Sequence, residues 1–205
     1  MCQEVFNIVR SMDLKSVELQ LALQCAPLIT GIKISNLLII DSAGESALRL
    51  ILRNSGISFY RLLQTKEKTA FLLFRRNQLE EYLSKEDIHD ILVNFGYEEF
   101  SLGCLLRTFK SRYETYTCQG DKFPHEMGIL LGYPIEDVVG FIDNNGKNYL
   151  YAGYWKVYSE VPNKKRLFAK YEESKECLIH LLAENIDMKL ILEIYKEELP
   201  QKLAV

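Results

Sequence analysis

Glycines and prolines in residues 123–142 limit how this chain can fold. The stretch reads FPHEMGILLGYPIEDVVGFI. Four of its residues are typical of helix starts and ends: Pro124, Gly128, Gly132 and Pro134. Because proline suits the start of a helix and glycine the position after its end, the pattern predicts two short helices joined by a glycine corner. His125 and Glu126 stand at the start of the first helix, where exposed backbone amides favour an anionic ligand.

The size and charge of the chain favour a folded protein that does not bind nucleic acid. Its 205 residues are 48% hydrophobic and 26% charged, and the formal net charge is −3. A net negative charge offers no general attraction to phosphate backbones or anionic membranes. No apolar run approaches the ~20 residues that span a bilayer, and the first residues lack the apolar core of a signal peptide. We therefore expect a cytoplasmic protein without nucleic-acid or membrane partners.

The cysteines and glycines do not form the common cofactor or disulfide motifs. The five cysteines are odd in number and far apart, and no CxxC pair occurs, which predicts reduced thiols in a cytoplasm. The phosphate-binding pattern GxxxxGK[ST] and the dinucleotide-binding pattern GxGxxG are missing as well. No cofactor is predicted.

Hydrophobic periodicity predicts an α+β fold. The clearest signal is a β-hairpin, with apolar runs at residues 57–64 and 69–75 separated by TKEK. Further strands are predicted at residues 37–40 and 148–158. Helices are predicted at residues 14–25, 43–53, 77–83, 85–95, 99–117, from 162 onward and at 188–197.

Several boundaries follow from capping residues. Asp13 is predicted to cap the first helix and Pro27 to end it, which leaves residues 26–33 as an ordered loop. Ser84 and Asp87 form the pattern of a capping box. The elements together predict a single domain over residues 1–205: a small antiparallel sheet with a helical middle and C-terminal helices. Its α/β-hairpin half covers about residues 1–83, and its helical and C-terminal half covers about 84–205.

Five segments of the chain resemble a family of uncharacterised bacterial proteins, a domain of unknown function found mainly in anaerobic clostridia and their relatives. The segments read CAPLITGIK (25–33), FPHEMG (123–128), LGYPIEDV (131–138), GFI (140–142) and GYWKVY (153–158). Met127 departs mildly from the branched aliphatic residue expected there. The resemblance implies one full-length domain in a bacterial cytoplasm, and it brings no established activity and no catalytic residues.

Residues 123–142 also admit two functional interpretations that the residue types disfavour. The glycine spacing resembles a DNA-binding helix-turn-helix, but the second helix carries Glu136, Asp137 and Asp143 and no basic residue, so it would repel phosphates. His125-Glu126 resembles the start of the zinc motif HExxH, but Ile129 occupies the position of the second histidine. We predict neither DNA binding nor a metal site.

A catalytic interpretation uses residues that are far apart in the sequence. Cys25 would be the nucleophile, His125 the base, and Glu126 or Asp137 the orienting acid, as in a hydrolase- or transferase-like enzyme. A buried, unreactive Cys25 is the competing interpretation. The distance between the thiol and the imidazole would distinguish the two.

A binding interpretation rests on the aromatic residues near the only tryptophan. The tyrosines at 149, 151, 154 and 158 and Trp155 would form an aromatic wall for a planar or anionic molecule. The predicted ligand-binding residues are Lys33, Tyr133, Asp137, Tyr151, Trp155 and Lys156. The alternative is strand alternation, in which half of these aromatic residues face the core.

We therefore predict a small-ligand-binding or accessory protein without catalysis. The enzyme that uses Cys25, His125 and Glu126 remains the alternative. The C-terminal helices, residues 163–198, carry an apolar stripe, which leaves a homo-oligomer open.

Overall fold

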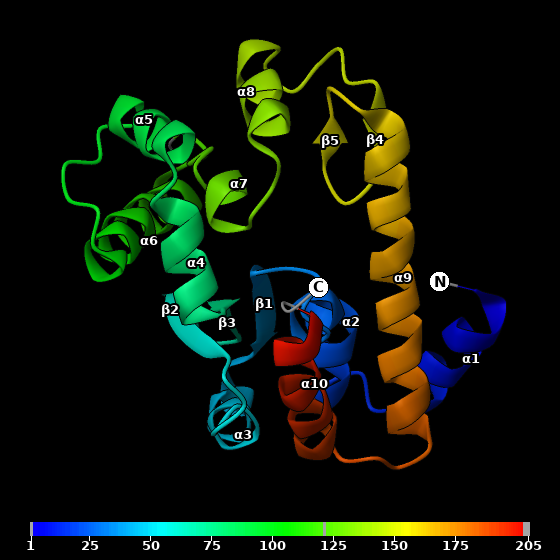
Figure 1. The fold of residues 1–205 in the computed structure, drawn as a ribbon. Helices are drawn as coiled ribbons and strands as arrows, with labels where there is room; N and C mark the ends of the chain where they lie inside the picture. Colours follow the sequence, from blue (N-terminus) through cyan, green and yellow to red (C-terminus); the bar gives the residue numbers. More distant parts are fainter. Residues whose placement is uncertain (1, 121, 203–205) are drawn as a thin grey trace. The chain divides into compact units, whose positions relative to one another are not determined.

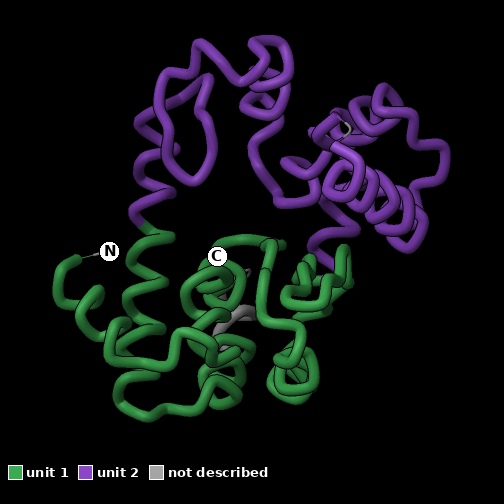
Figure 2. Tube along the Cα trace, turned by 180° about the vertical axis from the view of Figure 1, so that it is seen from behind, with its two compact units in different colours: residues 1–75, 170–205 green, residues 76–169 purple. Residues whose placement is uncertain are grey.

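The chain folds into two compact units. The structure, a computed structural model, describes the backbone of residues 2–120 and 122–202 and the side chains of residues 2–120 and 122–197. Unit 1 combines residues 1–75 with residues 170–205, and unit 2 comprises residues 76–169 (Figure 2). The units divide at residue 75, before the predicted division at residue 83, and the C-terminal segment belongs with the first unit. That residues 1–205 form a single domain stays a prediction.

Unit 1 contains a three-stranded sheet and the helices that pack on it (Figure 1). Its elements are α1 (Gln3–Ser11), α2 (Val17–Ile29), β1 (Ser35–Asp41), the 3-10 turn η1 (Ser42–Gly44), α3 (Glu45–Ile51), β2 (Ser58–Gln64), β3 (Lys68–Phe74) and α10 (Met188–Lys202). The long helix α9 (Val161–Ala183) begins in unit 2 and ends in unit 1.

The sheet is antiparallel, with the strand order β1-β3-β2. Strand β1 pairs with β3 from Ser35↔Phe74 to Asp41↔Lys68, and β2 pairs with β3 with a bulge between Arg61 and Leu63. The predicted β2–β3 hairpin is confirmed, and the amide of Thr65 closes its turn by donating to the Lys68 carbonyl at 2.8 Å. The small antiparallel sheet, the helical middle and the C-terminal helices confirm the predicted α+β class.

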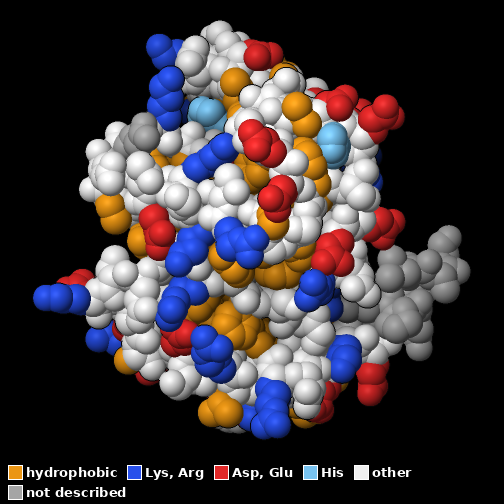
Figure 3. Space-filling model, turned by 90° about the vertical axis from the view of Figure 1, so that its left-hand side faces the viewer, with side chains coloured by type: hydrophobic (Ala, Val, Ile, Leu, Met, Phe, Trp, Pro, Cys, Tyr) orange, Lys and Arg blue, Asp and Glu red, His pale blue; other side chains and the backbone are white. Residues whose placement is uncertain are grey.

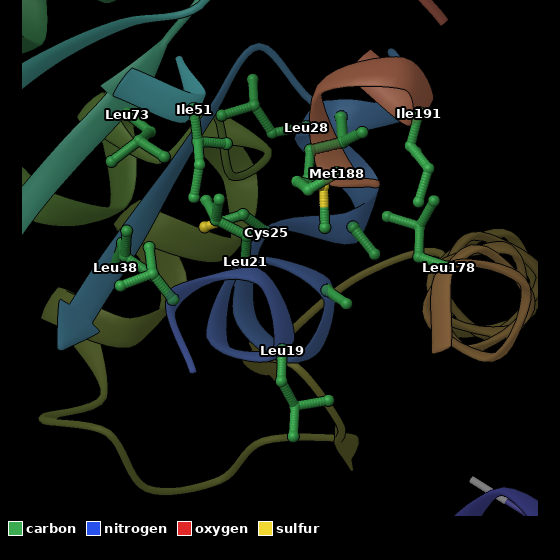
Figure 4. Close-up of a cluster of buried hydrophobic side chains, with 14 of the residues drawn as sticks. Leu19, Leu21, Cys25, Leu28, Leu38, Ile51, Leu73, Leu178, Met188 and Ile191 are labelled. Atoms are coloured by element: carbon green, nitrogen blue, oxygen red, sulfur yellow. The ribbon is translucent and has the colours of Figure 1, made fainter. Parts of the chain in front are cut away.

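The core of unit 1 is built around α2. Leu21 and Leu28 of this helix are fully buried and face side chains from β1, β3, α9 and α10 (Figure 4). Each fully buried leucine stabilises the fold by about 1.5–3 kcal/mol relative to an exposed one. Met188 at the start of α10 is also fully buried, which ties the C-terminal segment to the N-terminal core.

The predicted boundaries of α2 were wrong at both ends. Ser16 is the N-cap in place of Asp13, and its hydroxyl accepts a hydrogen bond from the Leu19 amide at 3.3 Å. The helix continues through Pro27 to Ile29, so the first four of the eight residues in the predicted loop at 26–33 are helical. Leu28 and Ile29 are completely buried, and this burial outweighs the hydrogen bond that proline cannot make.

Unit 2 is mainly helical. Apart from the first part of α9, its elements are α4 (Arg76–Leu83), α5 (Glu86–Asn94), α6 (Leu102–Gln119), α7 (Met127–Leu130), α8 (Ile135–Asp143), β4 (Tyr151–Ala152) and β5 (Lys156–Val157). Among the described residues of both units, no helix is long and apolar enough to cross a membrane.

The predicted capping box at α5 is absent. Lys85 is the N-cap and makes no side-chain capping bond, while the Ser84 hydroxyl donates to the Glu81 carbonyl at 2.8 Å. The Ser84 hydroxyl therefore completes the end of α4 and is not used to begin α5.

The predicted strand at residues 148–158 is a short hairpin. Strands β4 and β5 have two residues each, and Tyr151 pairs with Val157. The chain turns between them, where the Gly153 amide donates to the Trp155 carbonyl at 3.0 Å. The aromatic residues therefore do not alternate along one extended strand.

Candidate functional site

The glycine corner predicted in residues 123–142 is present between α7 and α8. Gly132 has a φ of 67°, a left-handed conformation that glycine adopts without strain. A Cβ added to Gly128 would lie 2.8 Å from a methyl group of Val138, so glycine permits the close approach of the two helices. Helix α7 is a single turn, so the corner lacks the two full helices of a DNA-binding helix-turn-helix.

The carboxylate of Asp137 joins α8 to the β4–β5 hairpin. The indole Nε1 of Trp155 donates to its Oδ2 at 2.7 Å, and the amide of Tyr158 donates to its Oδ1 at 2.8 Å. Lys164 of α9 lies 3.8 Å from the same Oδ2 and donates to Glu136 at 2.6 Å. Asp137 is 2% exposed, and these contacts supply the hydrogen bonds and the countercharge that a buried carboxylate requires.

Three of the aromatic residues that were predicted to form a ligand wall, Tyr151, Tyr154 and Trp155, pack on Phe168 of α9. The rings of Tyr133 and Trp155 stack with their centroids 4.7 Å apart. Trp155 meets Phe168 edge to face at 4.5 Å, and Tyr151 also stacks on Phe168. The Nζ of Lys156 donates to the Gly146 carbonyl at 2.7 Å. These contacts hold the hairpin against α8 and α9, and a ligand-binding role for its residues stays a prediction.

Lys33 and Cys25 lie in unit 1, whereas the other predicted site residues lie in unit 2. Cys25 is fully buried, and burial raises the pKa of its thiol to about 12, so the group is protonated at neutral pH. Burial lowers the pKa of Lys33 to about 8, which its interaction with Cys25 partly opposes. A buried, protonated thiol lacks the accessible thiolate that a nucleophilic cysteine needs.

His125 and Glu126 lie in different surroundings despite being adjacent. The His125 ring lies between Phe123 and Phe141, with centroid distances of 5.7 and 5.6 Å. Glu126 is only 3% exposed, and its Oε1 accepts hydrogen bonds from Arg112 at 2.9 Å and from the Tyr97 hydroxyl at 3.2 Å. Burial and the nearby Glu126 raise the pKa of Tyr97, which keeps this donor protonated.

A pocket of about 490 Å³ opens at the N-terminal end of α6, and we name it the α6 pocket. Its lining residues come from α4, α5, α6 and the segments that join them: Arg76, Glu80, Leu83, Ser84, His89, Phe100, Ser101, Leu102 and Gly103. The volume lies in the range of sites that hold small organic molecules. The leucines and Phe100 give it apolar walls, and Arg76, Glu80, Ser84, His89 and Ser101 contribute polar groups.

The residues that line the α6 pocket include Leu102 and Gly103, the first two residues of α6. The amides of Cys104 and Leu105 donate to the Ser101 carbonyl, so those of Leu102 and Gly103 precede the first helical hydrogen bond. Within the described part of the chain, the N-cap Ser101 makes no side-chain capping bond. The His89 ring stacks on Phe100 with a centroid distance of 3.9 Å and forms a flat aromatic wall.

A second, smaller pocket of about 260 Å³ lies beside Glu126, and we name it the Glu126 pocket. It is lined by Ser111, Arg112, Thr115, Lys122, Phe123, Pro124 and Glu126. Three residues of the glycine- and proline-rich stretch therefore line a pocket, whereas none of the predicted ligand-binding residues Lys33, Tyr133, Asp137, Tyr151, Trp155 and Lys156 lines either of the two.

No group of three or more His, Cys, Asp or Glu side chains that could hold a metal ion occurs in the part of the chain that the structure describes. All five cysteines are free thiols.

The residues of the α6 pocket were not predicted from the sequence. The sequence places Ser101 one residue before an apolar helix, which is a recognisable N-cap signal. Nothing in the sequence indicates that Arg76 and His89 lie near that cap, because they belong to other helices. Among the residues that line the Glu126 pocket, only Glu126 was predicted from the sequence as a candidate functional residue.

The fold and its pockets define an α+β protein whose mainly helical unit 2 contains the α6 pocket and the Glu126 pocket. Over residues 21–192 the chain matches the family described as "Protein of unknown function (DUF3793)", and it belongs to this family. A search of curated proteins and a search of solved structures found no significant match. Membership confirms the predicted resemblance to a domain of unknown function.

Proposed function

We propose that the protein binds a small anionic molecule with an apolar part in the α6 pocket and does not transform it. The single observation that carries this proposal is that the first residues of α6, whose amides precede the first helical hydrogen bond, line an apolar pocket of about 490 Å³. An apolar cavity with a few convergent polar groups is the usual form of a small-molecule site.

The polar end of the pocket suits a carboxylate or a phosphate. Helix α6 has 18 residues, and the positive end of its dipole and its first amides favour negative charge. Arg76 adds a cation, and its Nε donates to Glu80 at 3.0 Å, which offsets the one carboxylate that lines the pocket. The donors near Gly103 would hold the anion, and the wall of His89 and Phe100 would hold the apolar part.

Binding without catalysis is favoured over the enzymatic alternative. The nucleophile of that alternative, Cys25, lies in the core of unit 1 as a protonated thiol. The α6 pocket contains Ser84 and Ser101, but no hydrogen bond joins either hydroxyl to His89 among the described residues. A serine nucleophile needs such a base.

The predictions about the cellular compartment, nucleic-acid binding and self-association are part of the same proposal. A bacterial cytoplasm is part of this proposal; it comes from the resemblance of the five sequence segments, and the free cysteines suit a reducing compartment. The expectation of no nucleic-acid partner is supported by the net charge of −3, and acidic and basic side chains are interspersed over the face in Figure 3. Self-association is left open and would be tested by the mass of the protein in solution.

Backbone amide spectra test the proposal. The protein labelled with nitrogen-15 is titrated with phenyl phosphate, with benzoate and with the neutral benzyl alcohol. We expect saturable shifts of the Leu102 and Gly103 amides with both anions and much weaker shifts with the alcohol. Equal responses to all three probes, or no saturable shift with either anion, would contradict the proposal.

A pocket-filling variant supplies the matched control. A Cβ added to Gly103 would meet no heavy atom within 4 Å, so Gly103→Leu adds bulk at the pocket without a clash at its Cβ. Gly103→Leu is expected to lose the saturable shifts, whereas Gly103→Ala keeps them because it adds only one methyl group. Arg76→Met should weaken binding of both anions, and Arg166→Met, which changes a residue outside the lining, should not.

A further inference from the structure

Two rings that lie almost parallel form one wall of the α6 pocket. The His89 ring of α5 stacks on Phe100, with a centroid distance of 3.9 Å and an angle of 29° between the ring planes. Both residues line the pocket, and the His89 side chain is 45% exposed. The stack uses one face of the His89 ring, and the exposed part of this side chain is available to a further ring that enters the pocket.

An aromatic ring gains more at this wall than an aliphatic ring of the same size. Stacking of two aromatic rings adds to the free energy of apolar burial, and its usual size corresponds to about two- to tenfold in affinity. A saturated ring buries at least as much apolar surface and makes no such contact. A pocket that was only apolar would therefore not favour the aromatic molecule.

The charges at the pocket suit a ligand with a single negative charge. Arg76 and Glu80 both line the pocket and oppose each other, because the Arg76 Nε donates to Glu80 at 3.0 Å. The positive end of the α6 dipole adds about half an elementary charge. The Asp90 carboxylate lies 3.9 Å from the His89 Nδ1 and places a negative charge beside the wall. In the Born description the desolvation cost of an ion rises with the square of its charge, so a second negative charge costs more than this weak field returns.

We propose that the ligand of the α6 pocket is an aromatic carboxylate, an inference that rests on the proposed function and names the class of molecule for the same site. The ring of the ligand extends the stack of His89 and Phe100, and its carboxylate accepts hydrogen bonds at the start of α6. An aliphatic acid lacks the ring, and a phosphate monoester carries close to two negative charges above neutral pH. Both are therefore expected to bind more weakly.

Titrations with benzoate, cyclohexanecarboxylate and phenyl phosphate at pH 8 test the proposal. The two carboxylates have the same charge and the same six-membered carbon skeleton, so they differ in the aromatic ring alone. The Leu102 and Gly103 amides of the protein labelled with nitrogen-15 report the binding. We expect benzoate to bind about two- to tenfold more tightly than cyclohexanecarboxylate, and more tightly than phenyl phosphate.

The outcomes separate this proposal from the proposed function. If cyclohexanecarboxylate binds as tightly as benzoate or more tightly, or if phenyl phosphate binds more tightly than benzoate, the aromatic carboxylate is wrong and the anion-binding function stands. If none of the three saturates the amide shifts, the proposed function is wrong, and the aromatic carboxylate falls with it.

A substitution at His89 assigns the preference to the ring pair. Leucine keeps an apolar side chain in place of the ring, and His89 is exposed enough for the fold to tolerate the change. We expect benzoate to bind His89→Leu only as tightly as cyclohexanecarboxylate, whose own affinity stays near the wild-type value. His180→Leu makes the same change outside the lining and should keep the wild-type ratio of the two affinities. If His89→Leu also keeps that ratio, the proposal is wrong.

Discussion

The carboxylate of Asp137 holds the indole of Trp155 at 2.7 Å, and this bond links α8 to the turn of the β4–β5 hairpin. The hairpin has only two residues in each strand, so its own backbone pairing is too small to fix it. Asp137 also accepts from the amides of Tyr158 and Ser159. The buried acid therefore organises the aromatic cluster that the sequence suggested as a binding wall.

Asp137→Asn should destabilise unit 2 strongly. Asparagine keeps the size of the side chain, but its NH2 group is a donor and would face donors where the carboxylate oxygen accepted hydrogen bonds. We expect the free energy of unfolding to fall by an amount on the order of 2–3 kcal/mol. Urea unfolding followed by the fluorescence of Trp155, the only tryptophan, measures this change. Glu136→Gln on the same helix, with a side chain 43% exposed, is the control and should cost less than about 1 kcal/mol. Equal losses in the two variants would show that Asp137 has no special role.

Gln24→Glu should open the edge of the sheet in unit 1. The side-chain amide of Gln24 donates to the Ile39 carbonyl and accepts from the Ile39 amide, both at 2.9 Å, as a neighbouring strand would. A glutamate can accept but cannot donate, so the Ile39 carbonyl of the edge strand β1 loses its partner. We expect a loss of about 1–2 kcal/mol and a greater tendency to aggregate. Urea unfolding and light scattering at equal concentration measure the two effects, and an unchanged variant would refute the expectation.

Two helical glycines should respond in opposite directions to alanine. At Gly103 a Cβ meets open space, so Gly103→Ala should stabilise the protein by up to about 1 kcal/mol through helix propensity. At Gly140 a Cβ would lie 2.5 Å from the ring of Tyr158 and 2.7 Å from its Cβ, so something must shift. Gly140→Ala should therefore destabilise by about 1–3 kcal/mol. Thermal unfolding of both variants tests the pair, and a stabilised Gly140→Ala would count against the close packing of α8.

Stability should rise with pH between about 8 and 9 because of Lys33. Burial lowers the pKa of this lysine from 10.5 to about 8 in the folded protein. Above pH 8 the unfolded chain holds a proton that the folded chain has released, so the free energy of unfolding increases with pH. Urea unfolding at pH 7, 8 and 9 should show this rise in the wild type and a smaller one in Lys33→Met. If the free energy of unfolding depended on pH in the same way in the wild type and in Lys33→Met, the lowered pKa of Lys33 would be contradicted.

Cys25 should act in the opposite direction at higher pH. Burial raises the pKa of its thiol from 9.0 to about 12, so above pH 9 the folded protein keeps a proton that the unfolded chain has lost. Stability should then fall as the pH rises from 9 toward 12. Cys25→Ala is expected to reduce the slope of this fall, although cavity formation lowers its stability at every pH. A slope that matches the wild type would argue against a buried thiol.

The secondary-structure elements that depend on local sequence patterns could be predicted from the sequence. The β2–β3 hairpin follows from two apolar runs and a polar turn, and the glycine corner follows from residues that act on their own backbone. Helix α1 was missed, although Val5 and Val9 are spaced as the buried face of a helix. Local signals failed at Pro27, where tertiary burial of the next two residues extends the helix.

The sites depended on contacts that the sequence does not encode locally. Trp155 was read as part of a strand face, but its indole is held by Asp137, which lies 18 residues earlier. The α6 pocket brings Arg76, His89 and Gly103 together from three helices, and no periodicity predicts that meeting. Glu126 was identified from its place at a helix start, yet its partners Arg112 and Tyr97 come from another helix and a loop.

The binding of a small anionic molecule in the α6 pocket is the central claim, and non-denaturing mass spectrometry of protein purified from its native host tests it most directly. The wild type and Gly103→Leu are prepared in parallel without denaturing steps. We predict that the wild type retains a small anionic molecule as an added mass and that Gly103→Leu, which fills the pocket, does not. The same added mass on both proteins, or none on the wild type, would contradict the claim.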